Sequence, residues 1–129
     1  MNKLEGDGAI DLVFDSKYRK TRDQIAKKYF GGDRGSRRDA CLFALSLGIR
    51  FDKREPKKTW SGEKPLSWTD MNRLKSEIAD FEVLFEYMEI KDDSISSKEL
   101  MDELVTGGLK FIEMNDLVED GTLYQIELD

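Results

Sequence analysis

The sequence offers few of the side chains on which enzymes rely for catalysis. It contains no histidine and a single cysteine, Cys41. Nucleophilic Ser/His and Cys/His arrangements and histidine-based zinc sites are therefore excluded, and one cysteine does not make a thiolate metal site. Because Cys41 lies within the apolar run 40–45, we expect a buried thiol that packs as a small hydrophobic side chain.

The carboxylates form no recognisable catalytic pair. Glu89-Ile90-Lys91 matches the Glu-x-Lys half of a metal-dependent nuclease site, which needs an upstream carboxylate to complete a Mg²⁺ site. The triplet falls at the expected end of a helix instead of on a strand, which disfavours a nuclease. Other acidic residues could gather a divalent ion, but solvated helix ends explain them more simply: Asp92, Asp93, Asp116, Glu119 and Asp120. We therefore expect no catalytic residues, no metal site and no cofactor, in a chain that is not an enzyme.

A glycine-rich turn before a predicted helix is the first candidate binding site. The stretch from Gly31 to Ser36 contains three glycines but lacks both the Walker lysine spacing and the Rossmann pattern. The start of the helix nevertheless carries Arg34, Arg37 and Arg38, and the N–H groups of a first helical turn favour an anion. Two interpretations remain open here, a phosphate-binding helix start and a plain capped turn.

A basic loop between residues 50 and 65 is the second candidate binding site. Basic side chains surround an aromatic ring there, a combination that suits single-stranded nucleic acid or a flipped base. At about 16 residues the loop is longer than ordinary connections. The alternative is a solvated loop whose tryptophan packs on the core. The residues concerned are Lys53, Arg54, Lys57, Lys58 and Trp60.

The two halves of the chain carry opposite charge. Residues 1–65 hold 16 Lys and Arg against 10 Asp and Glu, a net charge of +6, whereas residues 66–129 hold 5 against 17, a net charge of −12. A basic half attracts phosphates, and an acidic half repels them and limits indiscriminate binding. The same division is compatible with two solvated faces or with the two ends of a molecule that forms a homo-oligomer.

The elements that must position these residues are mainly helical. The length favours one domain over residues 1–129, of α+β class, with about four helices and short strands at both ends. We expect helices over about 17–30, 36–47, 71–88 and 97–114, and strands over 9–14 and 122–128 that could pair with each other. Gly48 should end the second helix, and Gly107-Gly108 should mark a close helix crossing or a bend. The side chains expected to be buried are Phe43, Leu47, Ile78, Phe81, Phe85 and Leu104.

The order of elements from Ile10 to Ile49 is similar to that of ribbon-helix-helix DNA-binding proteins. In that family paired strands of a dimer enter the major groove and the start of the second helix grips a phosphate. The outward residues of the strand would here be Asp11 and Val13, and aspartate suits few base edges. The resemblance therefore implies phosphate binding by Arg34, Arg37 and Arg38 more than sequence reading by the strand.

A second resemblance covers about two thirds of the chain. The stretches Arg38 to Gly48, Arg54-Glu55-Pro56 with Pro65 to Trp68, and Thr106 to Lys110 resemble small proteins that accompany DNA phosphorothioation (Dnd) systems of bacteria and archaea. The resemblance implies a role beside sulfur-modified DNA or the associated anti-phage restriction machinery, and it assigns no reaction to this subunit.

These observations lead to one function and one alternative. We expect a non-enzymatic accessory or DNA-binding protein of such a system, with other proteins of the system as partners. The longest apolar run is too short to cross a bilayer and the start of the chain does not resemble a secretory signal, so we expect a cytoplasmic protein without a membrane partner. The alternative is an adaptor that docks a larger defence enzyme without touching DNA.

Overall fold

The computed structural model describes residues 11–33 and 35–115. Within these residues the chain is mainly helical, as expected, with five α-helices instead of about four and with a small antiparallel sheet. The elements in chain order are β1 (Asp11–Phe14), the 3-10 turn η1 (Ser16–Tyr18), α1 (Arg19–Phe30), α2 (Ser36–Phe51), the 3-10 turn η2 (Lys57–Thr59), β2 (Leu66–Asp70), α3 (Met71–Glu77), α4 (Phe81–Lys91) and α5 (Ser97–Met114).

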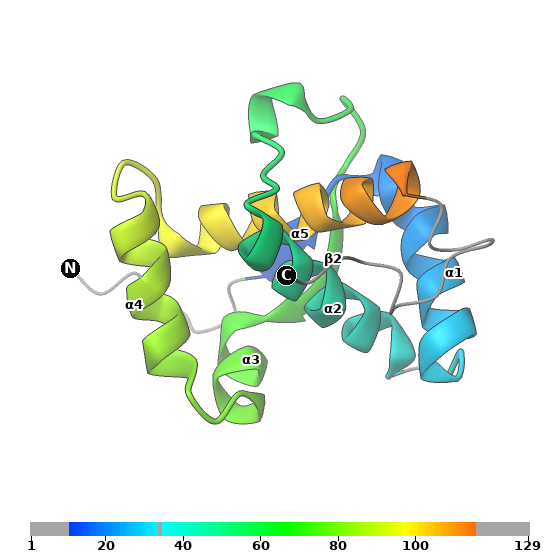
Figure 1. Cartoon of the computed structure of the whole chain (residues 1–129), viewed down its shortest axis with the longest axis horizontal. Helices are drawn as coiled ribbons and strands as arrows, with labels where there is room; N and C mark the ends of the chain where they lie inside the picture. Colours follow the sequence, from blue (N-terminus) through cyan, green and yellow to red (C-terminus); the bar gives the residue numbers. More distant parts are fainter. Residues whose placement is uncertain (1–10, 34, 116–129) are drawn as a thin grey trace.

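Helix α5 is the central element of the fold. Figure 1 shows it running through the middle of the molecule, with α1 near one end and α4 near the other. Ser96 caps it at the expected start of the helix by accepting a hydrogen bond from the Glu99 N–H at 3.1 Å. Every residue from 100 to 109 is buried, including the polar side chains of Asp102, Glu103 and Thr106. The other elements therefore pack around α5.

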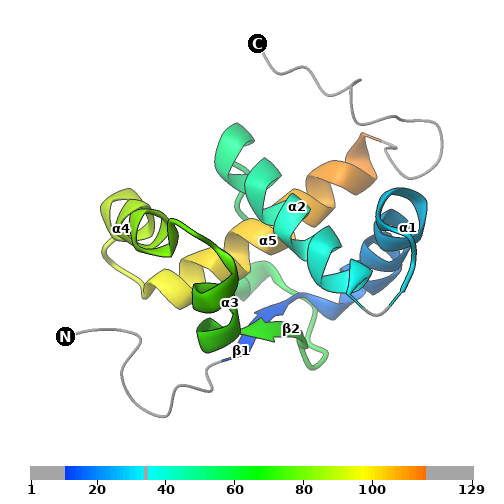
Figure 2. The same cartoon turned by 90° about the horizontal axis from the view of Figure 1, so that it is seen from below.

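Helices α2 and α5 cross closely because glycine stands at the contact on both helices (Figure 2). A Cβ atom at Gly108 would lie 2.6 Å from the carbonyl carbon of Ala44, and one at Gly48 would lie 3.0 Å from the carbonyl carbon of Leu104. The glycine pair 107–108 thus marks a crossing inside a continuous helix. The prediction that Gly48 ends α2 is wrong, since the helix continues to Phe51.

The end of α2 falls instead at Asp52, which adopts the left-handed conformation with φ 54°. Aspartate is one of the few residues other than glycine that tolerates this region. Helix α1 ends at Phe30, as expected from the sequence, and Gly31 after it has φ 92° and donates its N–H to the Ala26 carbonyl.

The sheet joins the predicted first strand to a segment that was not predicted as a strand. Strand β1 pairs antiparallel with β2, with Asp11 opposite Asp70 and Phe14 opposite Leu66. A helix was expected after the β2 segment, from residue 71, and no strand before it. Asp70 does cap α3, accepting a hydrogen bond from the Arg73 N–H at 2.8 Å, but the residues before it form the strand. The predicted partner of the first strand, 122–128, lies outside the described residues.

The helix expected over 71–88 is divided into α3 and α4. The first part ends at Ile78, whose backbone is extended, and the second starts at Phe81. The apolar spacing continues across the break, so Met71, Leu74, Phe81 and Met88 are all buried although they belong to two helices. Periodicity alone does not reveal such a break.

The buried side chains form one cluster around α5. Of the six expected core residues, Leu47, Phe81 and Leu104 are buried. The other three are half-buried and pack against the cluster: Phe43, Ile78 and Phe85. Cys41 is fully buried and unpaired, as predicted. Burial raises the pKa of its thiol, so the thiolate is disfavoured in the folded protein.

Candidate nucleic-acid interface

Four arginines line one pocket between the start of α2 and the β2–α3 region. Its volume is about 360 Å³. The arginines come from three helices and are joined by residues of β2. Among the described residues, those that line this arginine pocket include no carboxylate: Arg22, Gly35, Arg37, Arg38, Ser67, Trp68 and Arg73. The recess therefore presents positive charge from several directions.

Arg22 forms the fixed side of the arginine pocket. It lies on α1 and is only 6% exposed. Its Nε donates to Asp23 at 2.8 Å, and its guanidinium lies 5.2 Å from the centre of the Phe14 ring. Asp23 and the Phe14 ring together hold the Arg22 guanidinium in one orientation. They also offset the unfavourable free energy of burying this charged group.

The two arginines of the first turn of α2 link that turn to neighbouring helices. Asp33 caps the turn by accepting a hydrogen bond from the Ser36 N–H at 3.1 Å. Arg37 is largely exposed and its Nε lies 3.7 Å from Asp23, while Arg38 pairs with Glu77 of α3 at 3.2 Å. The Arg37 pair is largely exposed and the Arg38 pair is partly exposed, so each contributes only about 0–1 kcal/mol and can be exchanged for a ligand at little cost.

Two hydrogen-bond donors at the arginine pocket are buried without a partner among the described residues. They are Nε of Arg38 and Nε1 of Trp68. The sheet register shifts from Thr69 opposite Leu12 to Ser67 opposite Val13, so Trp68 is the extra residue between the two pairs. An unsatisfied buried donor costs about 1–3 kcal/mol, which a bound acceptor would recover. Two residues of the lining therefore each hold a donor that still lacks an acceptor.

A second basic depression lies beside the arginine pocket on α1. Its volume is about 350 Å³, and its lining is Arg19, Lys20, Asp23, Gln24 and Lys27. The carboxylate of Asp23 lines this depression and also contacts Arg22 and Arg37 of the arginine pocket. The two sites are therefore adjacent and form a basic surface over α1 and the start of α2.

In the loop predicted as a second nucleic-acid surface, two basic side chains form ion pairs with carboxylates of the protein itself. Arg54 donates from Nε to Glu103 at 2.6 Å and pairs with Asp92 at 2.8 Å. Lys57 pairs with the buried Asp102 at 2.9 Å, and its backbone N–H donates to Glu103. These contacts fasten the loop to α5. Arg54 and Lys57 are therefore poorly placed to leave the protein for a phosphate.

The far end of the loop is also fastened. Asp15 is 2% exposed and accepts two hydrogen bonds from Ser61, from its backbone N–H at 2.9 Å and its hydroxyl at 2.6 Å. Trp60 is half-buried and donates from Nε1 to the Glu55 carbonyl. Lys57 Nζ lies 5.6 Å from the centre of the Trp60 ring. The tryptophan thus supports the loop, and Lys58 remains exposed beside it.

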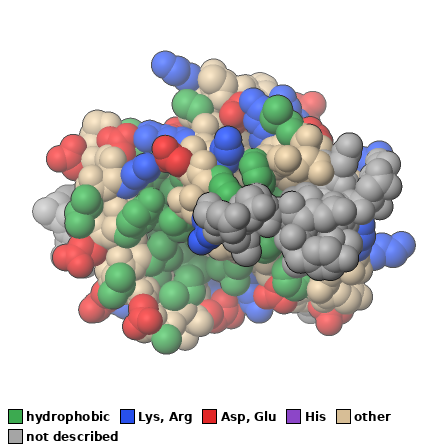
Figure 3. Space-filling model, viewed as in Figure 1, with side chains coloured by type: hydrophobic (Ala, Val, Ile, Leu, Met, Phe, Trp, Pro, Cys, Tyr) green, Lys and Arg blue, Asp and Glu red, His purple; other side chains and the backbone are tan. Residues whose placement is uncertain are grey.

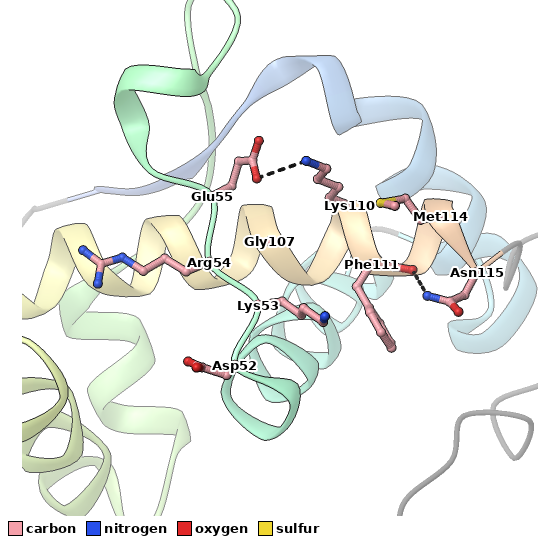
Figure 4. Close-up of a pocket in the computed structure, with 9 residues that line it drawn as sticks. All are labelled: Asp52, Lys53, Arg54, Glu55, Gly107, Lys110, Phe111, Met114 and Asn115. Atoms are coloured by element: carbon pink, nitrogen blue, oxygen red, sulfur yellow. Dashed lines mark hydrogen bonds and ion pairs between the residues drawn. The ribbon is translucent and has the colours of Figure 1, made fainter.

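The remaining loop lysine, Lys53, lines a larger pocket of about 510 Å³ against α5 (Figure 4). Gly107 lets the loop lie this close to α5, because a Cβ atom there would lie only 2.7 Å from the backbone nitrogen of Arg54. Lys53 Nζ lies 5.6 Å from the centre of the Phe111 ring, and Lys110 pairs with Glu55 at 3.4 Å. Asp52 and Glu55 both line this pocket, so its charge is mixed. It offers less to an anion than the arginine pocket does.

The acidic groups that hold the loop have shifted pKa values. Hydrogen bonds from Ser94 and from Arg54 lower the pKa of Asp92 to about 2. Burial raises the pKa of Asp102, although hydrogen bonds from Lys98 and the Val13 N–H and the nearby Lys57 oppose that shift. We interpret Asp92 and Asp102 as structural groups, since each carboxylate already binds basic side chains and backbone N–H groups of the chain itself.

The site that emerges differs in part from the predicted one. Arg37 and Arg38 line the arginine pocket together, and Arg34 lies outside the described residues. The sequence did not point to Arg22, Trp68 or Arg73, because nothing in their spacing indicates that their segments meet.

The resemblance to ribbon-helix-helix proteins does not extend to the strand pairing. Strand β1 pairs with β2 of its own chain, and the Val13 N–H donates to Asp102 at 2.9 Å. The expected strand ribbon would require β1 to pair with its copy in a second protomer. What remains of the comparison is the pair of arginines at the start of the second helix, Arg37 and Arg38.

In the part of the chain that the structure describes, no three His, Cys, Asp or Glu side chains gather as metal ligands. No helix in that part is long and apolar enough to cross a membrane. Comparison with protein-family models, with curated proteins and with solved structures found no match to the chain.

Proposed function

We propose that this chain is a non-enzymatic accessory protein that binds DNA through its phosphates. The observation that carries the proposal is the arginine pocket, with four guanidinium groups and no carboxylate in its described lining. Assignment to a DNA phosphorothioation-type modification and anti-phage restriction system rests on the sequence resemblance alone, as does the expectation that other proteins of that system are its partners.

The arrangement of charges favours contact with the DNA backbone over contact with bases. Guanidinium groups match phosphate oxygens with paired donors, and Lys and Arg contacts to phosphate supply most of non-specific affinity. The depression on α1 adds Arg19, Lys20 and Lys27 next to the arginine pocket. Strand β1, by contrast, is already paired with β2 and cannot act as a free ribbon in the major groove. Binding should therefore depend only weakly on sequence.

The proposal is tested by fluorescence anisotropy with labelled duplex and single-stranded DNA at several salt concentrations. The variant pair Arg38→Gln and Arg73→Gln removes two charges from the arginine pocket. Lys58→Gln and Lys64→Gln together form a matched control, because they remove the same charge from exposed loop positions. With four or five phosphate contacts, log affinity should fall against log salt with a slope of about −4.

The two variants should differ clearly. Removing both arginines should reduce the size of that slope by about two, since each duplex phosphate contact contributes about 0.9. The control should retain the native slope. Equal losses in both variants would mean that overall charge, and not the arginine pocket, governs binding. Absence of binding at low salt to either DNA would reject the proposal and favour the adaptor function.

An exposed apolar strip on α4 favours that adaptor function as the second candidate. Val83 is 65% exposed and Ile90 is 80% exposed, and their spacing of seven places them on the same side of the helix. Figure 3 shows hydrophobic side chains gathered over and beside α4 on this face. Replacing Val83 and Ile90 by serine should abolish capture of a larger defence enzyme while leaving the anisotropy titration unchanged.

A further inference from the structure

We infer that the arginine pocket receives a phosphate monoester, as found at the end of a nucleic-acid strand or on a free nucleotide. The inference rests on the proposed function and narrows the group that the site recognises. It is carried by three properties of the arginine pocket: its donors, its position between several elements, and its two unpartnered N–H groups.

The donor set exceeds what an internal phosphodiester can use. A diester within a strand carries one negative charge and two free oxygens, whereas a monoester carries about −1.5 to −2 at neutral pH and three free oxygens. Four arginines and Trp68 line the recess, and the carboxylates that pair with these arginines, Asp23 and Glu77, are not among the lining residues. The excess of charge and donors therefore suits the monoester.

The position of the arginine pocket points the same way. Its lining residues come from α1, α2, β2 and α3, so it is a recess between elements. Figure 2 shows the start of α2 lying between α1 and the β2–α3 region. The nucleic-acid strand continues in two directions from an internal phosphate, so a site for it needs two exits. From an end phosphate the strand continues in one direction only. The depression along α1, lined by a single helix, is the better place for internal phosphates.

The two unpartnered donors belong to residues that line the recess. Nε1 of Trp68 and Nε of Arg38 are both buried without a partner in the described structure. An indole N–H only donates, so it needs an acceptor, and a third phosphate oxygen supplies one. One additional charge-assisted hydrogen bond corresponds to about a tenfold gain in affinity.

The test compares two versions of one single-stranded oligonucleotide, labelled at its 3′ end and carrying either a 5′-phosphate or a 5′-hydroxyl. We expect the native chain to bind the phosphorylated strand about tenfold more tightly. Trp68→Phe should bring this ratio close to one, because it removes the N–H and keeps an aromatic ring. Its melting temperature should stay near the native value, since no hydrogen bond is lost and the side chain is half-buried. Arg38→Gln should also lower the ratio, whereas Lys58→Gln should preserve it.

Three outcomes separate this inference from the proposed function. Equal affinity of the native chain for both strands, with Arg38→Gln weakening both alike, overturns the inference and leaves DNA binding standing. No binding of either strand overturns both. A native preference that Trp68→Phe and Arg38→Gln leave intact overturns the assignment to the arginine pocket. Where the preference holds, competition by deoxyadenosine 5′-monophosphate distinguishes the sources: displacement near the strand's own dissociation constant identifies a nucleotide site, and resistance to it identifies a strand-end site.

Discussion

Replacing Gly108 with alanine tests how closely α2 and α5 cross. The added Cβ atom would lie 2.6 Å from the carbonyl carbon of Ala44 and 3.0 Å from its Cα atom. These are backbone atoms of a helix, which cannot rotate away as a side chain can, so the two helices would have to separate. Overpacking of a core typically costs about 1–3 kcal/mol, and a backbone clash belongs at the upper end.

The net effect is smaller than the clash alone because alanine is the better helix former. Glycine within a helix is unfavourable by about 0.5–1 kcal/mol relative to alanine, and this gain offsets part of the strain. We therefore expect Gly108→Ala to lower the free energy of unfolding by about 2 kcal/mol. For a chain of this size the melting temperature should fall by about 7 °C. Urea and thermal unfolding followed by circular dichroism measure both quantities.

Gly62→Ala is the matched control for this substitution. A Cβ atom at Gly62 would meet no heavy atom within 4 Å, and its φ does not lie in the left-handed region. The same chemical change there should leave stability unchanged or raise it slightly, by up to about 1 kcal/mol. If Gly108→Ala unfolds like the native chain and like Gly62→Ala, the close crossing of α2 and α5 is refuted.

The remaining predictions concern reactivity, ion pairing and pH. Cys41 should resist thiol reagents in the native protein and react on unfolding, because burial raises the pKa of its thiol; rapid native labelling would contradict its burial. Glu77→Gln should strengthen DNA binding, since it removes the carboxylate that pairs with Arg38 at 3.2 Å, and weaker binding in the anisotropy titration would argue against a ligand at Arg38. The pKa of Asp92 is lowered from 3.8 to about 2, so its contribution to stability is complete above 3.8 and is lost as the pH falls through 2. Chemical denaturation across this pH range should show a smaller acid loss in Asp92→Asn than in the native chain.

Local signals in the sequence were sufficient for most of the helical framework. The cap at Ser96, the stop at Gly31 and the buried Cys41 follow from short patterns whose physical cause lies within a few residues. For Gly107-Gly108 the sequence left two explanations, a close helix crossing and a bend, and the structure shows the crossing. Such features are predictable because the interactions that decide them are local.

Features decided by distant segments were missed. Gly48 has the local character of a helix end, yet it serves a crossing with Leu104, and no pattern around Gly48 contains that information. Strand β2 was overlooked because its pairing with β1 spans some fifty residues of chain. The break after Ile78 contains neither glycine nor proline, so the regular apolar spacing concealed it.

The residues of the candidate site fall into the same two groups, those indicated by local patterns and those brought in by distant segments. Arg37 and Arg38 were identified because they stand at a recognisable helix start. Arg22, Trp68 and Arg73 join them only through the packing of α1, β2 and α3 against that start. Arg54 and Lys57 were chosen for their charge, but their carboxylate partners are some thirty to fifty residues away in sequence. Composition shows how many cations a chain has, and the fold decides which of them are available.

The fastening of the long loop at Ser61 leaves a short stretch that a protein engineer can use. Residues 62–65 are exposed between the hydrogen bonds of Ser61 to Asp15 and the first residue of β2. Their ends are held in place independently of what lies between them, so added residues there cost only loop-closure entropy, which grows slowly with length. An epitope or a fluorescent label grafted at Gly62 would report on the chain in a cell extract without entering the core or the arginine pocket.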